Sequence, residues 1–245
     1  MTKHHSHTVA ILGYNNHKLT INAIKQLRKI GCDDSILFFD NGSTPSFENL
    51  LDDKNIIYLR KEENLFVNPA WNEIFDIVDT KYLTLLNNDC FVESDNYFKD
   101  IIPHMENNDI IISSCKTKNV KFYNPILKYI YQLKYRLKFQ DEKLQFTNNA
   151  RRQGWLMTIN LDVYKSLDYK IPDYLKVWYG DDWIWSQMLL NDKNTAIYTN
   201  KYALHVKGSS TSKIPEIIQS DVKNIEKFGD WYKKTTHIMH GKKYA

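Results

Sequence analysis

Short apolar runs alternate with segments of helical periodicity through the first half of this 245-residue chain. Continuous runs of this length are typical of strands buried on both faces of a sheet. They cover residues 9–14, 35–40, 56–59, 82–86 and 110–113. Apolar side chains recur at helical spacing between them, at residues 19–30, 69–78 and 95–105. The alternation predicts an α/β fold with a mostly parallel central sheet and helices on both faces.

The second half of the chain is less regular. Its periodicity and turn residues still predict several further elements. These are a helix at 125–139, a strand at 154–160, helices at 161–167 and 181–190, strands at 195–198 and 202–206, and a closing helix at 214–228.

The composition is that of a globular protein, with 42% hydrophobic and 25% charged residues. No apolar stretch reaches the roughly 18 residues that a membrane span needs. The three cysteines, Cys32, Cys90 and Cys115, lack motif spacing, so reduced thiols are expected. This favours a cytoplasmic location, in the host for a viral protein, with or without attachment to a membrane surface. The first histidines, His7 included, are expected to lie in a frayed terminus.

Positive charge is concentrated in residues 116–152, which carry ten Lys or Arg and only two acids. The same segment is rich in Phe and Tyr. One interpretation is a surface for an anionic partner, with Lys134, Arg136 and Arg151 among its contacts. A solvated helix face with aromatic side chains packed beneath it explains the pattern equally well.

Three polar residues, Asn87, Asn88 and Asp89, follow the apolar run at 82–86. The carboxyl end of a buried strand is where open α/β sheets bind ligands. A carboxylate there is a hard oxygen ligand suited to Mg²⁺ or Mn²⁺, and such an ion holds a diphosphate. The alternative is an ordinary turn, in which Asn and Asp are common.

The first two strands also end in polar residues. Tyr14 and Asn15 follow the first strand, and Asp40 closes the second. Tyr14 can lie against a nucleobase, and Asp40 can accept hydrogen bonds from a base or ribose. Taken alone, an Asp-Asn-Gly turn at Asp40 explains that segment, but two polar strand ends at one sheet edge favour a binding site.

Asn64 and Asn72 bracket the start of a predicted helix. Asn68 is a plausible N-cap, with Pro69 at the first helical position. A buried asparagine facing a nucleotide can read base edges. Capping and core packing explain Asn68 well and Asn72 poorly, so Asn64 and Asn72 are candidate nucleotide contacts.

Two adjacent acids, Asp181 and Asp182, open a predicted helix among large aromatic residues. Acids are common at helix N-termini, so capping is one explanation. Aromatic neighbours exclude water and raise the pKa of a carboxyl group, which suits a general base. Aromatic faces also stack on sugar rings. The aromatic residues expected to contact a sugar or acceptor are Trp155, Trp178, Tyr179 and Trp183.

The last polar segment follows the final predicted strand. His205 can complete a metal site, and Lys207 and Ser209 can contact phosphate oxygens. A lone histidine after a strand is usually structural, so its candidacy depends on its position after the acidic pair.

In this order the polar segments resemble the motifs of a family-2 glycosyltransferase with the glycosyltransferase-A fold. The resemblance covers roughly residues 8–212. The matching segments are Gly13-Tyr14-Asn15, Asp40-Asn41-Gly42-Ser43-Thr44, Asn64-Leu65-Phe66 with Ala70-Trp71-Asn72, Leu86-Asn87-Asn88-Asp89, Gly180-Asp181-Asp182, and His205 to Thr211. Phe66 replaces the family's glycine, so the loop over the nucleotide is expected to differ. Asn87 and Asn88 replace carboxylates, which is expected to weaken metal binding.

The resemblance implies a glycosyltransferase that moves a sugar from a nucleoside-diphosphate sugar, a UDP-sugar being favoured, to a hydroxyl acceptor with inversion. Asp182 would then be the base, Asp181 would orient it or bind acceptor, and Asp89 and His205 would hold Mn²⁺ or Mg²⁺. The basic segment would bind an anionic acceptor, either a hydroxymethylated base in viral DNA or a lipid-linked glycan.

Two other functions stay open on the residues alone. One is an inactive nucleotide-sugar-binding module, because Asp89 is the single carboxylate of its segment. The other is a nucleotidyltransferase, although the basic glycine-rich loop of that class is absent after the first strand. We expect a single domain over residues 1–245, divided into a nucleotide-sugar-binding half (8–115), an acceptor half (116–212) and a closing helix with a basic tail (213–245).

Overall fold

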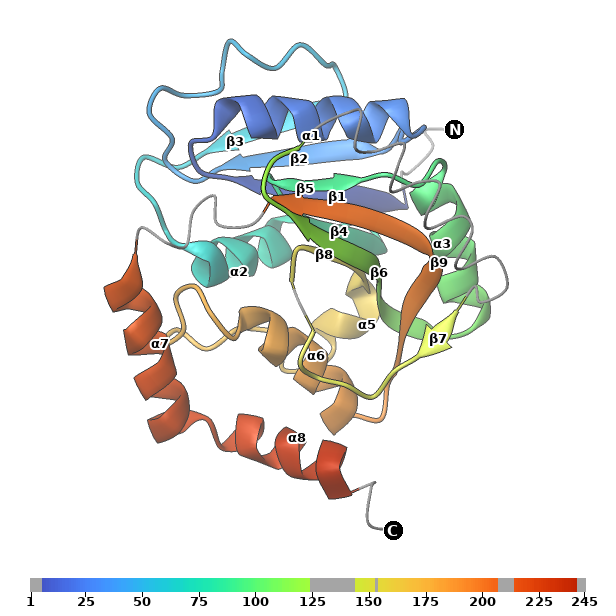
Figure 1. Cartoon of the computed structure of the whole chain (residues 1–245), viewed down its shortest axis with the longest axis vertical. Coiled ribbons are helices and arrows are strands. Elements are labelled where there is room, and N and C mark those ends of the chain that lie inside the picture. The colour runs from blue at the N-terminus through green and yellow to red at the C-terminus, as the bar shows by residue number, and fades with distance from the viewer. Residues whose placement is uncertain (1–5, 124–143, 153, 207–213, 242–245) are drawn as a thin grey trace.

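The computed structural model describes residues 6–123, 144–152, 154–206 and 214–241. Its centre is a nine-stranded sheet in the order β3-β2-β1-β4-β8-β6-β9-β5, with β7 paired to β9 (Figure 1). The strands are β1 (His7–Gly13), β2 (Ser35–Asp40), β3 (Ile56–Arg60), β4 (Tyr82–Asn87), β5 (Cys90–Val92), β6 (Ile110–Val120), β7 (Gln145–Phe146), β8 (Leu156–Asn160) and β9 (Asn194–Val206).

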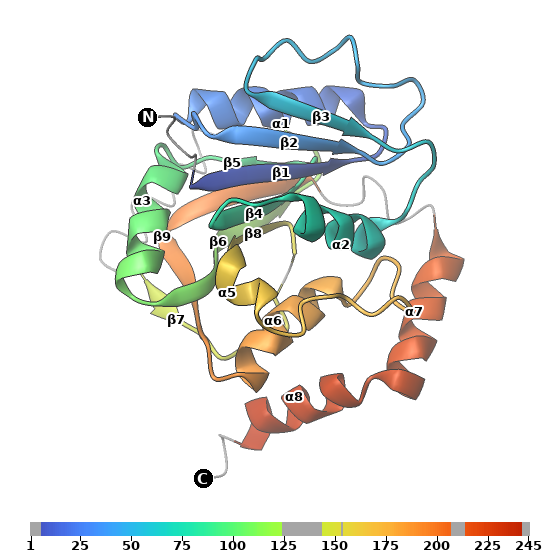
Figure 2. The same cartoon turned by 180° about the vertical axis from the view of Figure 1, so that it is seen from behind.

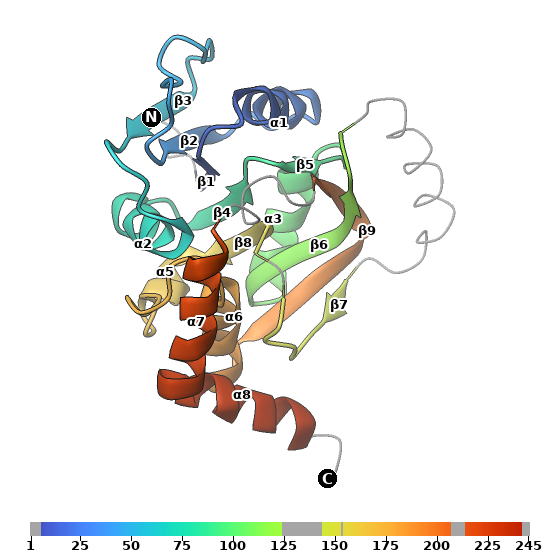
Figure 3. The same ribbon diagram turned by 60° about the vertical axis from the view of Figure 1, so that its left-hand side comes forward.

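Helices cover both faces of this sheet (Figures 1 and 2). α1 (His17–Lys29) and α3 (Tyr97–Asn107) pack on one face. The opposite face carries α2 (Val67–Ile77), α5 (Leu161–Lys165) and α6 (Gly180–Leu190). The chain then continues into α7 (Pro215–Phe228) and α8 (Asp230–Gly241), and α8 lies against α6 (Figure 3).

Strand β1 shows why the sheet is covered on both sides. Successive side chains of a strand point to opposite faces. Val9 and Ile11 therefore enter the core beneath α1 and α3, whereas Ala10 and Leu12 enter the core beneath α2 and α6. All four are buried. Residues 9–12 enter both cores and are all apolar, as burial on both faces of a sheet favours.

The predicted fold class is confirmed, with one refinement of the sheet. Strands β3, β2, β1 and β4 run parallel to one another. β8 then pairs antiparallel with both β4 and β6, and β5 pairs antiparallel with β9. The sheet is thus parallel in its first half and mixed beyond β4.

Several elements differ from their predictions. β9 is one strand, because it runs on through an irregularity where its pairing with β6 skips from Tyr198 to Tyr202. The tail after residue 228 is helical and forms α8. α2 begins at Val67, so Asn68 lies inside the helix, where its Nδ2 donates to the carbonyl of Trp178 (3.0 Å). The helix predicted at 125–139 lies outside the described residues.

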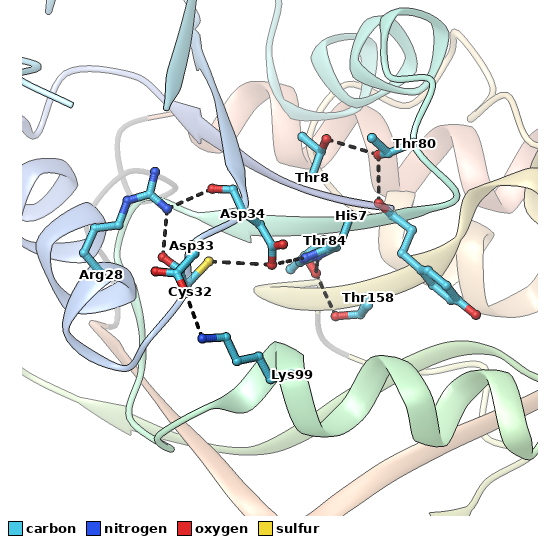
Figure 4. Close-up of polar contacts among 11 residues, drawn as sticks. His7, Thr8, Arg28, Cys32, Asp33, Asp34, Thr80, Thr84, Lys99 and Thr158 are labelled. Carbon is cyan, nitrogen blue, oxygen red and sulfur yellow. Dashed lines mark hydrogen bonds and ion pairs between the residues drawn. The ribbon is translucent and has the colours of Figure 1, made fainter. Parts of the chain in front are cut away.

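His7 is an ordered part of β1, so the prediction of a frayed terminus is wrong there. Only 1% of its surface is exposed. Figure 4 shows its ring between Asp34 and Thr84, with Nδ1 2.8 Å from the Asp34 carboxylate and Nε2 2.9 Å from Thr84 Oγ1. Thr84 Oγ1 lies in turn 2.8 Å from Thr158 Oγ1. These bonds satisfy buried polar groups at the amino ends of the strands.

Candidate active site

A first cavity of about 140 Å³ lies at the carboxyl ends of β1 and β4. We call it the strand-end cavity. Its walls include Tyr14, Asn64, Phe66, Asn88 and Asp89. They come from the loops after β1, β3 and β4, which meet because parallel strands end at the same edge of a sheet.

A second cavity of about 520 Å³ adjoins the first and holds the acidic pair. We call it the aromatic cavity, because Trp71, Trp155, Trp178 and Tyr179 line it. Its remaining walls include Arg151, Arg152, Asp181 and Asp182. Val67, Asn87 and Val177 line both cavities, so the two adjoin at these residues.

The structure brings Asp89 and His205 together, although 116 positions separate them in the sequence. Asp89 Oδ1 lies 3.4 Å from His205 Nε2, and both residues are buried. The contact follows from the sheet, because Cys90 of β5 pairs with His205 of β9. Within the described residues, no cluster of three or more His, Cys, Asp or Glu side chains has the arrangement of a metal site.

Two neighbours fix the orientation of the His205 ring. Its Nδ1 lies 2.9 Å from Asn119 Oδ1, and its Nε2 faces Asp89. The Trp155 indole stacks on the ring, with centroids 3.9 Å apart and an interplanar angle of 10°. A carboxylate oxygen and an imidazole lone pair at this separation repel each other unless a cation or proton lies between them.

The acidic pair opens α6, as predicted. Asp181 Oδ2 accepts a hydrogen bond from the backbone N–H of Gly154 (2.8 Å), and Oδ1 accepts one from the N–H of Asp182 (3.0 Å). Burial raises the pKa of Asp181 to about 6, against the lowering effect of these bonds. Burial, reinforced by the charge of Asp181, raises the pKa of Asp182 to about 7. Asp182 is therefore the more basic member of the pair.

Two glycines allow the close packing behind this pair. A Cβ on Gly154 would lie 2.8 Å from both Asp181 Cβ and Trp71 Cη2, and one on Gly180 would lie 2.0 Å from Asn68 Oδ1. Both distances are far inside van der Waals contact. Any larger residue at either position would move the start of α6 and its two carboxylates.

Asp221 of α7 holds the loop that walls both cavities. Its carboxylate is fully buried and accepts hydrogen bonds from the backbone N–H groups of Lys176, Val177 and Trp178 (2.8–2.9 Å). Trp178, which is 43% exposed, thereby faces the aromatic cavity from a loop with satisfied backbone donors.

Most of the predicted nucleotide contacts reach the strand-end cavity. The residues that line it are Tyr14, Asn15, Asn64, Asn87 and Asn88. Asn15 also receives the backbone N–H of Thr44 on its Oδ1 (3.0 Å), which ties the loop after β1 to the turn after β2.

Two of the predicted nucleotide contacts are taken up by the protein itself. Asp40 is fully buried, and its carboxylate accepts hydrogen bonds from Tyr58 Oη (2.7 Å) and the backbone N–H of Ser43 (2.9 Å). Asn72 exchanges two hydrogen bonds with the backbone of Ile171 (2.8 and 2.9 Å). Neither residue lines the strand-end cavity. The assignment of both to the nucleotide is corrected on these contacts.

Among the predicted acceptor contacts, Trp155, Trp178, Tyr179 and Arg151 line the aromatic cavity. Trp183 does not: it is 7% exposed and packs edge-on against Trp231 of α8, with ring centroids 5.0 Å apart. Its assignment as a sugar contact is corrected for that reason. Four other predicted contacts, Lys134, Arg136, Lys207 and Ser209, lie outside the described residues.

Sequence reasoning missed several residues that shape the site. Asn41 lines the strand-end cavity, but in its turn only Asp40 was predicted to contact the nucleotide. Gly154 and Arg152 precede β8 with no motif of their own. Asn119 and Asp221 act on His205 and on the loop at 176–178 across long sequence separations. No local pattern marks such partners.

The comparisons with known proteins agree with this architecture. No curated protein matches the chain in sequence. Among solved structures, TarS 1–349 of S. aureus in complex with UDP-GlcNAc is similar at 15% identity and a TM-score of 0.62, over 84% of this chain and 60% of that one. GalNAc-T7 with UDP, GalNAc and Mn²⁺ is similar at 14% identity and a TM-score of 0.66, over 93% of this chain and 49% of that one.

At these identities the two structures establish the fold, and this chain spans only about half to three fifths of their length. None of the helices in the described segments is long and apolar enough to cross a membrane. The family model described as glycosyl transferase family 2 matches residues 8–169, which is more than half of the chain. The chain therefore belongs to glycosyl transferase family 2, and its fold is the glycosyltransferase-A fold.

Proposed function

We propose that this protein transfers a sugar from a nucleoside-diphosphate sugar, with UDP favoured, to a hydroxyl group of an acceptor, with inversion at the anomeric carbon. The observation that carries the proposal is that the two cavities adjoin at Asn87. Asp89 lines the strand-end cavity, with His205 Nε2 3.4 Å from its carboxylate, and Asp182 lines the aromatic cavity. A donor diphosphate and an acceptor hydroxyl bound in the two cavities would meet at Asn87.

The residues present fit a divalent cation. Asp89 supplies a buried carboxylate, and His205 supplies a ring nitrogen oriented by Asn119 and Trp155. Asp89 and His205 would hold Mn²⁺ or Mg²⁺, with the diphosphate and water as further ligands. When bound, the ion would offset the negative charge that develops on the departing nucleoside diphosphate.

The acceptor hydroxyl would be activated by Asp182. Its raised pKa lets the carboxylate take a proton near neutral pH, whereas an ordinary aspartate is too weak a base there. Trp178 and Tyr179 would exclude water and stack on the sugar. With Asp182 as the base in the aromatic cavity, the acceptor oxygen would attack directly from the face opposite the leaving group, which inverts the anomeric centre.

The acceptor is proposed to be anionic. Arg151 and Arg152 line the aromatic cavity, and among the described residues neither forms an ion pair with a carboxylate. The Arg151 guanidinium instead donates to α8, to the Tyr232 carbonyl (2.7 Å) and the Thr236 hydroxyl (2.8 Å). The charge of Arg151 also acts on the acidic pair, where it lowers the pKa of both acids, so Arg152 is the group proposed to bind a phosphate of viral DNA or of a lipid-linked glycan. The three cysteines are free and buried, which fits the proposed cytoplasmic location.

A screen of UDP-, GDP- and dTDP-sugars for Mn²⁺-stimulated hydrolysis tests the function. Hydrolysis of one UDP-sugar, abolished by EDTA and restored by Mn²⁺, is the expected result. Adding hydroxymethylated DNA or vesicles that carry a lipid-linked glycan should accelerate turnover with the true acceptor only, and salt should weaken its binding. A protein that binds no sugar nucleotide with Mn²⁺ present would not have this function.

Asp181→Asn is expected to shift the acidic limb of the pH–rate profile downward by about one pH unit. Part of the raised pKa of Asp182 comes from the charge of Asp181, so removing that charge lowers the pKa. Because the deprotonated base is the active form, a lower pKa keeps activity to lower pH. The asparagine Oδ1 can still accept the Gly154 N–H that orients the pair. An unshifted profile measured from pH 5 to 8.5 would show that the two acids act independently.

A further inference from the structure

Phe66 has a backbone conformation that side chains rarely adopt. Its φ is 68° and its ψ is −175°, a region populated almost solely by glycine. The residue precedes the first residue of α2. The resemblance described above has glycine here, and the backbone keeps a glycine-like conformation although the residue is phenylalanine. Strain of this kind persists only where the surroundings impose it and is common at ligand sites.

Two asparagine side chains impose this conformation. Asn64 Oδ1 accepts the backbone N–H of Phe66 (2.9 Å), and Asn41 Nδ2 donates to the Phe66 carbonyl (3.1 Å). Asn41 Nδ2 also donates to Asn64 Oδ1 (2.9 Å), and Asn41 Oδ1 accepts the N–H of Leu65 (2.9 Å). The loop after β3 is thus clamped on both sides of the strained residue.

Among the described residues, the Phe66 side chain belongs to none of the hydrophobic core clusters. Its neighbours Leu65 and Val67 pack against the core beneath α2, whereas Phe66 does not. Phe66 lines the strand-end cavity instead, together with Tyr14, which is 41% exposed. Core packing therefore gives no reason for a phenylalanine at a position where glycine would be free of strain.

The place of these rings along the sheet indicates what they contact. Asp89 follows β4, and the order β3-β2-β1-β4 puts Tyr14 one strand away and the loop that carries Phe66 further along the same edge. Neighbouring strands are about 4.8 Å apart. A nucleotide whose diphosphate lies at Asp89 would extend past the ends of β1 and β2 and bring its base to the two aromatic side chains.

We propose that Phe66 determines nucleotide binding by forming, with Tyr14, the aromatic walls of the nucleobase pocket, and that the Asn41–Asn64 clamp holds its strained backbone for this purpose. The inference rests on the proposed function, since it requires a nucleoside-diphosphate donor. It extends that function by naming the residue that replaces the family's glycine as a base-contacting residue.

Phe66→Gly tests both the backbone strain of Phe66 and the proposed contact of its ring with the base. It removes the strain and the ring together, so the thermal midpoint should be equal to or higher than that of the wild type. The Kd for UDP with Mn²⁺, measured by calorimetry, should rise about tenfold because base stacking is lost. The Kd for inorganic pyrophosphate with Mn²⁺, which has no base, should stay within about twofold. Phe66→Leu should weaken UDP binding without the gain in stability.

Asp109→Gly is the matched control. Asp109 also has a positive φ (52°), in the turn between α3 and β6, and lines neither cavity. This variant should gain stability and bind UDP as the wild type does. Unchanged UDP affinity in Phe66→Gly, or equal losses for UDP and pyrophosphate, would overturn the role of Phe66 and leave the proposed function standing. A wild-type protein that binds neither ligand would overturn the proposed function itself.

Discussion

Replacing Asp182 with asparagine is expected to abolish sugar transfer, with a fall in kcat of about 10³-fold. Asparagine has nearly the same size and shape as aspartate but cannot accept the acceptor's proton. Asp182 lies in the aromatic cavity and does not line the strand-end cavity, so the Kd for UDP with Mn²⁺ should stay within about twofold. Transfer is measured by release of UDP in the presence of acceptor, and binding is measured by calorimetry.

The raised pKa of Asp182 also fixes the sign of the effect on stability. In the unfolded chain the carboxyl loses its proton near pH 4, whereas in the folded protein it keeps the proton up to about pH 7. The folded state binds more protons across this window, so its stability falls as the pH rises from about 4 to 7. Asp182→Asn should therefore be at least as stable as the wild type at pH 8. A variant that keeps both its fold and its transfer rate would place the base elsewhere.

Local sequence patterns predicted the first half of the fold because they match local physics there. Residues 9–12 and 36–39 are all apolar, which burial on both faces of the sheet favours. The helix at 19–30 ends at Gly31, whose φ of 84° suits glycine at the end of a helix. The strand order of the mixed half could not be predicted from local patterns. β8 enters the sheet between β4 and β6 through pairings that no local pattern encodes.

The wrong site assignments have one physical cause. A polar or aromatic residue near a strand end can serve a ligand or a distant part of the same chain, and the sequence does not distinguish the two. Asp40 accepts a hydrogen bond from Tyr58, and Asn72 donates one to Ile171, 99 positions away. Trp183 packs edge-on against Trp231. Each partner satisfies or buries the side chain, and none of the three residues is in the lining of either cavity.

The pairing of Asp89 with His205 could be predicted because it did not depend on such partners. The resemblance to the family's motif order supplied both residues, and antiparallel pairing of β5 with β9 brings them within 3.4 Å. The orientation of His205 by Asn119 was not predictable, since a side chain on β6 reaches it through a parallel pairing formed only in the sheet.

Asp89→Asn is expected to abolish the Mn²⁺-dependent part of UDP binding, with a loss in Mn²⁺ affinity of about 100-fold. Asp89 is 5% exposed, so its charge is little screened by water, and the buried pair with His205 has no other carboxylate to take its place in the strand-end cavity. Asparagine keeps the volume and one oxygen but loses the charge. Titration of Mn²⁺ by electron paramagnetic resonance, with and without UDP, measures the loss directly and needs no acceptor.

Asn88→Asp changes the charge at the proposed ion site in the opposite direction, because it adds a carboxylate beside Asp89. Asn88 lies beside Asp89 at the cavity and donates from Nδ2 to Thr20 Oγ1 (3.0 Å). The Thr20 hydroxyl donates to the Asn16 carbonyl (3.2 Å) and would have to turn from it to donate to a carboxylate at position 88. The substitution keeps the side-chain volume and adds one negative charge at the proposed ion site. Mn²⁺ affinity should rise, because ligand charge strengthens the binding of a hard divalent cation. Equal Mn²⁺ affinities for the wild type, Asp89→Asn and Asn88→Asp would show that the ion, if the enzyme uses one, is held by other groups.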